Sequence, residues 1–413
     1  MKNEHTSLFI ILLIVFIGFI GSSMSYPLFP PLFLHPGQET LLPTAWHADT
    51  RNILLGIALA AYPLGQFIGL PILGSYSDQY GRKKILIISL VGSFIGYGLS
   101  AISLQQHWLW PLLISRFLTG LMEGNLAIAR AMAADLTGMS KHKNFGHINA
   151  AASIGYLLGP LLGGFLSDKQ FIPWVSFATP FFVATLFTLV TLILAALKLK
   201  ERERQARIQS VPLLQQFNLI QRFRLLFKNP LLKYLLVTSS VFTFAIDIFY
   251  EFGPVYLTGT WLMTPAWLAI YNAALCLTLA IGHGWLSPYL SVVFSHQKGT
   301  ILSIIVTAIV FLFMIVWPSK LIVFLLFAVS GLSIAVGTNN ITVQISNNAK
   351  QAIQGEVMGA QLSLRMLGDA TICLIGGFII ISSVAAPMVI SSVIAFIAVL
   401  IYIRKCRLAY FIS

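Results

Sequence analysis

The chain has 413 residues, of which 57% are hydrophobic and 9% are charged, and its formal net charge is +13. Soluble domains carry about 25% charged residues, so a soluble core could not hide this much apolar surface, and the bilayer must be the solvent for much of the chain. In a soluble protein a charge of +13 would suggest nucleic acid as a partner. Here the basic residues lie in short loops between apolar segments, which argues against nucleic-acid binding and predicts a membrane protein.

Long apolar segments follow one another along the whole chain. A helix needs about 20 apolar residues to cross the hydrocarbon core of a bilayer. The first segment is longer than the apolar part of a signal peptide, so we expect it to be an uncleaved first span. The sequence predicts an all-α membrane protein with twelve spans, at residues 8–34, 52–74, 84–104, 108–133, 146–167, 174–197, 231–257, 264–289, 299–317, 320–345, 356–381 and 386–404.

A polar, basic segment separates the sixth span from the seventh. It predicts three parts: an N-terminal bundle of six helices (1–197), a cytoplasmic linker (198–230) and a C-terminal bundle of six helices (231–413). With the N-terminus inside, twenty Lys and Arg residues fall on the cytoplasmic side, three fall outside and three lie within spans. Because basic residues are retained on the cytoplasmic side, we expect both termini in the cytoplasm and a location in a bacterial inner membrane.

The loop after span two reads GSYSDQYGRKK, from Gly74 to Lys84. Two glycines allow close helix approach and a tight turn. A carboxylate stands beside a basic cluster, and a plain basic loop would not explain this spacing. The loop resembles the signature of the major facilitator superfamily. Two further matches agree with that resemblance: RFLTG in span four, from Arg116, and GYLLGPLLGG in span five, from Gly155.

The resemblance implies two six-helix bundles related by pseudo-symmetry, with a substrate site between them near the middle of the membrane and spans one, four, seven and ten lining it. The span-five motif is typical of drug–proton antiporters, and its glycines provide a flat face for tight packing while its proline adds a bend. The resemblance also implies that Arg82 interacts with Asp135, and that the loop forms a latch which closes the cytoplasmic side. The implied latch residues are Gly74, Asp78, Gly81, Arg82, Lys83 and Asp135, and the helix-packing motif is Gly155, Gly159, Pro160, Gly163 and Gly164.

Charged side chains inside spans are costly and are therefore candidates for function. Span four carries Arg116, Glu123 and Arg130, whose spacing of seven residues predicts one shared helical face. Such a face must contact a cavity or charged partners rather than lipid. Arg116 is a candidate substrate contact and would suit an anionic substrate.

Span seven carries Asp247 and Glu251, which share a face because they are four residues apart. No basic residue is within reach on the same helix. Because loss of water disfavours a charged carboxylate, Asp247, Glu251 and also Glu123 are candidates for carrying a coupled proton. The alternative is a static ion pair in which Arg116 holds one of the span-seven carboxylates.

Span eleven carries Arg365 and Asp369 at the same spacing of four, which predicts an ion pair within that helix. Neutral polar residues on the cavity-lining spans are further candidates for contacts with the substrate. They are Ser22, Tyr26, Asn125, Asn339 and Asn340. Span one lacks the acidic residue that several drug–proton antiporters carry there, so the proton carrier must lie on another span or the protein is not a proton antiporter.

The resemblance and these residues predict a secondary active transporter that works by alternating access and exports a small organic compound, such as a drug, metabolite or siderophore, in exchange for protons. The alternatives are proton-coupled uptake of a nutrient or an iron–siderophore complex, and a membrane sensor or scaffold that does not transport. Three cysteines without metal-site spacing, and no catalytic constellation, predict no enzyme, no cofactor and no metal. The expected partners are the substrate, protons and lipid, and we expect a monomer.

Overall fold

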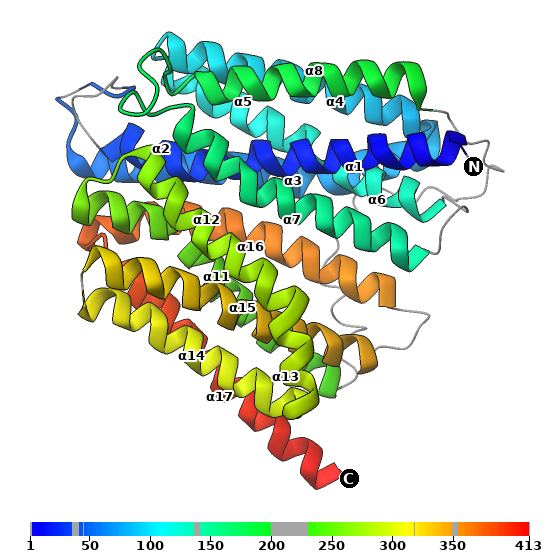
Figure 1. The fold of residues 1–413 in the computed structure, drawn as a ribbon, viewed down its shortest axis with the longest axis vertical. Helices are drawn as coiled ribbons and strands as arrows, with labels where there is room; N and C mark the ends of the chain where they lie inside the picture. Colours follow the sequence, from blue (N-terminus) through cyan, green and yellow to red (C-terminus); the bar gives the residue numbers. More distant parts are fainter. Residues whose placement is uncertain are drawn as a thin grey trace. The chain divides into compact units, whose positions relative to one another are not determined.

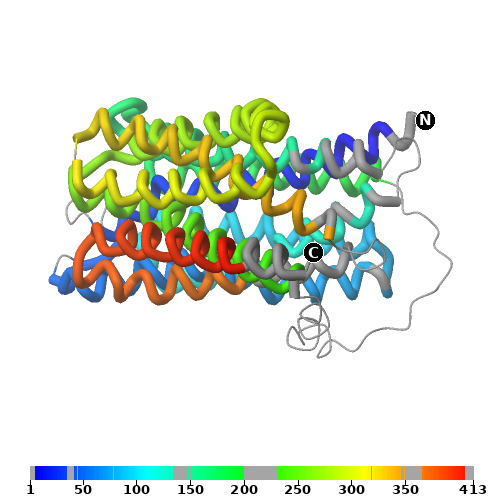
Figure 2. Tube along the Cα trace, turned by 90° about the horizontal axis from the view of Figure 1, so that it is seen from below, coloured from blue at the N-terminus to red at the C-terminus, as the bar shows by residue number. Residues whose placement is uncertain are grey.

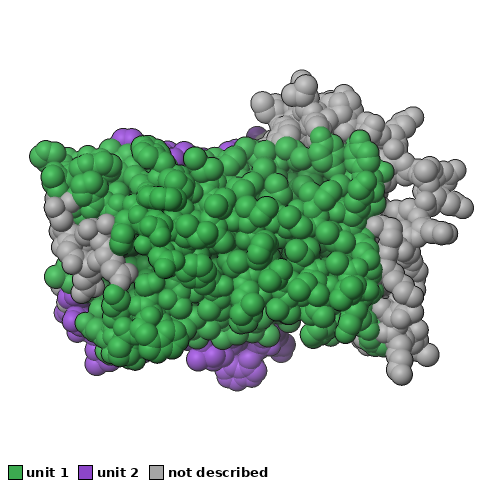
Figure 3. Space-filling model, turned by 90° about the horizontal axis from the view of Figure 1, so that it is seen from above, with its two compact units in different colours: residues 1–217, 262–269 green, residues 218–261, 270–413 purple. Residues whose placement is uncertain are grey.

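The computed structural model describes residues 2–34, 41–43, 45–135, 141–199, 230–317, 319–348 and 354–412. These ranges are built from helices and short turns, and they contain no β-strand. The chain divides into two compact units, which are coloured in Figure 3: unit 1 comprises residues 1–217 and 262–269, and unit 2 comprises residues 218–261 and 270–413. Of the predicted linker, residues 200–229 lie outside the described ranges.

Two of the spans in unit 1 are built from two consecutive helices each. The first is interrupted at Met24 and runs over His5–Leu34, and the fourth is interrupted at Glu123 and Gly124 and runs over Leu109–Ala133. The helices of unit 1 are labelled in Figure 1: α1 (Lys2–Ser23), α2 (Ser25–Leu34), α3 (Ala48–Tyr80), α4 (Arg82–Gln105), α5 (Leu109–Met122), α6 (Asn125–Asp135), α7 (Lys141–Phe165) and α8 (Thr179–Lys198).

Unit 2 holds most of the remaining helices, and Figure 2 shows α16 and α17 side by side, in agreement with their packing. The first residues of α12 belong to unit 1, where the amide of Ala266 donates a hydrogen bond to Oδ2 of Asp168 over 3.3 Å. The helices are α11 (Pro230–Trp261), α12 (Pro265–Ile281), the π-helix η1 (Gly282–Leu286), α13 (Ser287–Val293), α14 (His296–Val316), α15 (Lys320–Asn348), α16 (Gln354–Ser382) and α17 (Ala386–Ile412).

Eleven helices among the described residues are long and apolar enough to cross a membrane. The remaining predicted span corresponds to α7, in which the apolar part is the shorter helix Ala150–Phe165. The prediction of an all-α membrane protein is confirmed, and the count of twelve spans is approximately met.

Exposed apolar side chains lie along single helix faces, as expected for contact with lipid. On α8 they recur every three or four residues, which is the repeat of one face of a helix. A soluble monomer rarely exposes such a continuous apolar stripe. The stripe on α8 is Phe182, Leu186, Val190, Ile193 and Leu197, and a similar one on α4 is Ile88, Val91, Ile95, Leu99 and Ile102.

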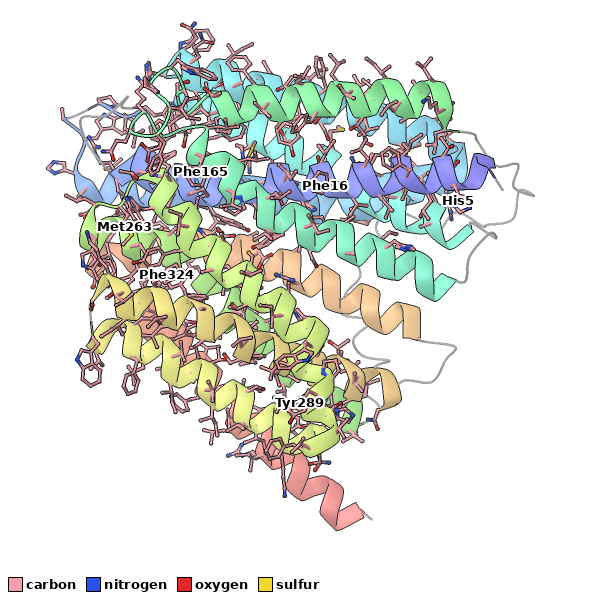
Figure 4. The ribbon with its side chains drawn as sticks, viewed as in Figure 1. His5, Phe16, Phe165, Met263, Tyr289 and Phe324 are labelled. Atoms are coloured by element: carbon pink, nitrogen blue, oxygen red, sulfur yellow. The ribbon has the colours of Figure 1, made fainter. Side chains whose placement is uncertain are left out.

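The span-five glycines lie where α7 approaches α1 most closely. A β-carbon at Gly155 would lie 2.5 Å from the carbonyl oxygen of Phe16, a residue that Figure 4 labels on α1. A β-carbon at Gly159 would likewise collide with Ile20 and Ser23 of α1, and one at Gly163 would collide with Met24 and with Leu28 of α2. The absence of side chains therefore lets the two backbones touch along three turns.

Span eight is longer than the sequence indicates. We expected it to end at residue 289, but α12, η1 and α13 form one helical span over Pro265–Val293. The chain then turns at Ser295, whose Oγ accepts a hydrogen bond from the amide of Lys298 and caps α14. Within this span, the backbone after Ile281 forms a π-helical turn.

Candidate functional site

Glu123 lies at the interruption between α5 and α6, near the middle of its span. Its side chain is buried, and the hydroxyl of Tyr97 on α4 donates a hydrogen bond to its Oε1 over 3.4 Å. A β-carbon at Gly18 on α1 would lie 2.6 Å from Oε2, so the absence of a side chain at Gly18 makes room for the carboxyl group. Residues from three parts of unit 1, namely α1, α4 and the interruption between α5 and α6, therefore define where the Glu123 carboxyl group lies.

Arg116 is enclosed by aromatic rings within unit 1. Only 2% of the residue is exposed, and its Nη2 donates a hydrogen bond to Oγ of Ser25 over 3.0 Å. Its guanidinium carbon lies 4.8 Å from the ring centre of Tyr62, and 5.6 Å from those of Phe29 and of Phe181. Cation–π contacts of this kind offset part of the free-energy cost of removing the guanidinium from water.

The two charged groups of span four belong to one buried polar cluster. Glu123 interacts electrostatically with Arg116, and Tyr62 interacts with both groups and with Tyr97. We predicted that Arg116, Glu123 and Arg130 share one face of a continuous helix, but α5 ends at Met122 and α6 begins at Asn125. The side chain of Arg130 lies outside the described residues.

A second charged cluster lies midway along α11 and α16 in unit 2. Nη2 of Arg365 donates a hydrogen bond to Oδ1 of Asp247 over 3.1 Å. The carboxyl group of Asp369 interacts with those of Asp247 and Glu251, and the thiol of Cys373 interacts with Glu251. Three carboxyl groups therefore gather around one guanidinium.

This arrangement differs from the predicted ion pair within span eleven. Arg365 reaches across to α11, and Oδ1 of Asp369 is buried without a hydrogen-bond partner among the described residues. Spacing along one helix showed that Arg365 and Asp369 share a face. It could not show that α11 brings a competing carboxylate to the same place.

The neutral candidates of spans one and four lie in different surroundings. Ser22 donates a hydrogen bond to the carbonyl of Phe19 over 3.0 Å, and the ring of Tyr26 lies 5.9 Å from that of Tyr156. Asn125 is 2% exposed, and its Nδ2 donates no hydrogen bond within the part of the chain that the structure describes. Asn125 is thus the neutral candidate with an unused buried donor.

The two asparagines of span ten contact neighbouring helices of unit 2. Nδ2 of Asn339 donates a hydrogen bond to the carbonyl of His283 in η1 over 3.3 Å. Oδ1 of Asn340 lies 3.1 Å from Nδ1 of His296 at the start of α14. These contacts connect α15 to both neighbours.

The signature loop between α3 and α4 is a single-residue turn. Gly81 has a φ of 101°, a conformation that favours glycine. Arg82 donates to the carbonyl of Ala131 on α6, and Nζ of Lys83 donates to the carbonyl of Ala196 over 2.9 Å. The loop is therefore bound to the ends of two other helices of unit 1.

Other parts of the expected latch differ or lie beyond what is described. A β-carbon at Gly74 would have Ala127 as its nearest neighbour at 3.9 Å, so Gly74 does not mark the close approach that we expected. The side chains of Asp78 and Asp135 lie outside the described residues.

Sequence reasoning did not single out Tyr97 or the role of Asp369. A signal for Tyr97 was present, since Ser89, Ser93, Tyr97 and Ser100 recur every three or four residues and form a polar stripe in an apolar span. The stripe is buried, and it faces the helices that carry Glu123 and Arg116. Asp369 lacked such a signal because the carboxyl groups beside it, those of Asp247 and Glu251, come from another helix.

Long apolar helices in two units, each with charged side chains buried midway along its spans, define a multi-pass membrane protein. Residues 11–373 match the family model described as Major Facilitator Superfamily, and the chain belongs to that family.

Its relatives include proteins of drug resistance. The chain is 33% identical over 202 residues to the class H tetracycline resistance protein of Pasteurella multocida, a match covering 49% of this chain and 46% of the relative. It is 30% identical over 213 residues to multidrug resistance protein 1 of Bacillus subtilis (strain 168), covering 51% of this chain and 49% of the relative. The matches thus span about half the length of these curated relatives.

Solved structures share the fold at lower identity. A bacterial homolog of the human lysosomal transporter Spinster, inward-facing and occupied, has a TM-score of 0.76 at 15% identity, covering 98% of this chain and 97% of that one. The human organic anion transporter MFSD10 has a TM-score of 0.68 at 17% identity, covering 97% of this chain and 99% of that one. At such identities the likeness concerns the fold alone.

Proposed function

We propose that this chain is a secondary active transporter that works by alternating access and exports a small organic compound in exchange for protons. The observation that carries the proposal is the cluster of three carboxyl groups around Arg365 at the middle of α11 and α16. A purely structural cluster would balance its charges, because an uncompensated buried charge is costly. An excess of carboxyl groups provides places where protons bind and leave.

The direction of transport and the class of substrate rest on the relatives. The relatives that match about half of this chain are named for tetracycline resistance and multidrug resistance. These names favour export of a small organic compound. The fold itself is shared with a D-xylose–proton symporter, so the fold alone supports neither direction. The excess of basic residues in the loops assigned to the cytoplasm supports a cytoplasmic membrane location with both termini inside.

The proposal assigns a role to each predicted group. Glu123, Asp247 and Glu251 are candidates for proton binding, and Asn125 is the candidate with most support for a substrate contact because its buried amide has a donor to offer. Ser22, Tyr26, Arg116, Asn339 and Asn340 stay candidate contacts. The loop from Gly74 to Lys84 is proposed as the latch of the cytoplasmic side.

Everted membrane vesicles test the proposal, with tetracycline as the first probe. Acidifying the vesicle lumen should drive tetracycline into the lumen as protons leave, and collapsing the pH gradient should stop accumulation. Glu123→Gln or Asp247→Asn should reduce accumulation to background while the protein still folds. Asp49→Asn is the matched control, because Asp49 is an exposed acid at the start of α3.

Two results would count against this function. Loss of tetracycline from preloaded vesicles on lumen acidification would indicate uptake rather than export. Unchanged dependence on the pH gradient in Glu123→Gln, Asp247→Asn and Glu251→Gln would remove all three proton-binding assignments.

A further inference from the structure

The carboxyl group of Asp369 lies in the unit 2 cluster, where it forms a side-chain hydrogen bond with the carboxyl group of Asp247. Asp247 holds the guanidinium of Arg365 at 3.1 Å, and Glu251 interacts with the thiol of Cys373. Oδ1 of Asp369 is buried and accepts no hydrogen bond from the described residues. A carboxylate in this position would lack the donors that normally stabilise its charge, whereas a protonated carboxyl group needs fewer of them.

The charged and titratable groups that face Asp369 come from two helices. Asp247 and Glu251 approach from α11, and Arg365 and Cys373 lie one turn before and one turn after it on α16. The neighbouring helix α17 carries no charged residue between Ala386 and Ile403. Arg365 is therefore the cation for which Asp247 and Asp369 compete.

Arg365 also gives the cluster a connection to water. Its side chain is 43% exposed, whereas that of Asp247 is 5% exposed. A guanidinium on a membrane-spanning helix is costly to expose to lipid. Where this exposed part borders water, a proton has a route to the carboxyl groups behind it.

We propose that Asp369 takes up and releases the coupled proton, and that Arg365 changes its partner from Asp247 to Asp369 when that proton leaves. This inference rests on the proposed function for its physiological meaning. In the arrangement described here Asp369 carries the proton and is neutral, and Arg365 neutralises Asp247. Loss of the proton to water leaves an Asp369 carboxylate that attracts Arg365, and Asp247 is then free to bind the next proton or a cationic group.

Infrared difference spectroscopy of the purified full chain tests the proton site without transport. We expect a C=O band of a protonated carboxyl group that is retained in Glu123→Gln to vanish as pH rises in the wild type, and to be missing in Asp369→Asn. The band should persist in Glu251→Gln. In Asp247→Asn it should persist with its titration midpoint at lower pH, because Arg365 becomes available to the Asp369 carboxylate. Glu251→Gln is the matched control, because it removes a neighbouring carboxyl group without releasing Arg365. The titration midpoint of the band should therefore shift less in this variant than in Asp247→Asn.

Transport measurements then separate this inference from the proposed function. Asp369→Asn should lose accumulation driven by the pH gradient yet retain exchange of labelled for unlabelled tetracycline, and Asp369→Glu should recover accumulation. If the band titrates as expected but the wild type moves no probe in response to a pH gradient, the proposed function fails while the proton site stands. A band that survives Asp369→Asn, or that is absent from the wild type, would overturn the proton site.

Discussion

The charged side chains of span four illustrate how the environment of a residue determines what it does. Arg116 has three aromatic rings and a serine hydroxyl around it, so its charge is compensated by contacts that do not depend on a ligand. Glu123, two turns away, accepts a long hydrogen bond from Tyr97 and interacts with Ser93. The arginine is therefore well suited to holding helices together, and the glutamate is the better candidate for a proton that comes and goes.

Replacing Arg116 by lysine tests this view of the residue. Arg116→Lys retains the positive charge but removes the planar group that lies against the rings of Tyr62, Phe29 and Phe181. We expect a loss of stability of about 1–2 kcal/mol for the weakened contacts, seen as a lower melting temperature of the purified protein. Unchanged melting combined with weaker substrate binding would instead make Arg116 a substrate contact.

Pairs of helices in unit 1 meet through glycine. Where α3 crosses α5, a β-carbon at Gly120 would lie 2.0 Å from the carbonyl oxygen of Tyr62, and one at Gly69 would lie 1.9 Å from that of Leu121. Backbone atoms cannot move aside as the end of a flexible side chain can. The close crossing holds Tyr62 beside Arg116, so the packing of the helices also positions the buried cluster.

Two glycine-to-alanine substitutions compare a crowded position with an open one. Gly120→Ala should push α5 away from α3 and cost about 1–3 kcal/mol, as overpacking of a dense core does. Gly284→Ala is the control, because a β-carbon there would have nothing within 4 Å, and it should be neutral or stabilise η1 by about 0.5–1 kcal/mol. Melting temperatures measured by tryptophan fluorescence would decide, and equal values for both variants would contradict the close crossing.

At the scale of the molecule, the chain arranges its spans into two units with the basic loops on one predicted side. The end of α4 and the start of α14 provide a direct check of that sidedness, because an exposed turn lies at each of them. We expect cysteine at Gln106, after α4, to react with a membrane-impermeant maleimide in intact cells, and cysteine at Gln297, at the start of α14, to react only after the membrane is disrupted. Both glutamines are exposed, so failure to react reports sidedness rather than burial. The reverse pattern would place the termini outside.

The class of the protein, the approximate number and the order of its spans, and the family followed from the sequence alone. Length and apolar content decide whether a helix crosses a bilayer, and these are properties of one segment at a time. The partner of Arg365, the aromatic surroundings of Arg116 and the buried position of the Asp369 carboxyl group among other acids were decided only by the tertiary structure. Each depends on side chains from helices far apart in sequence, and spacing along one helix carries no information about which neighbour packs against it.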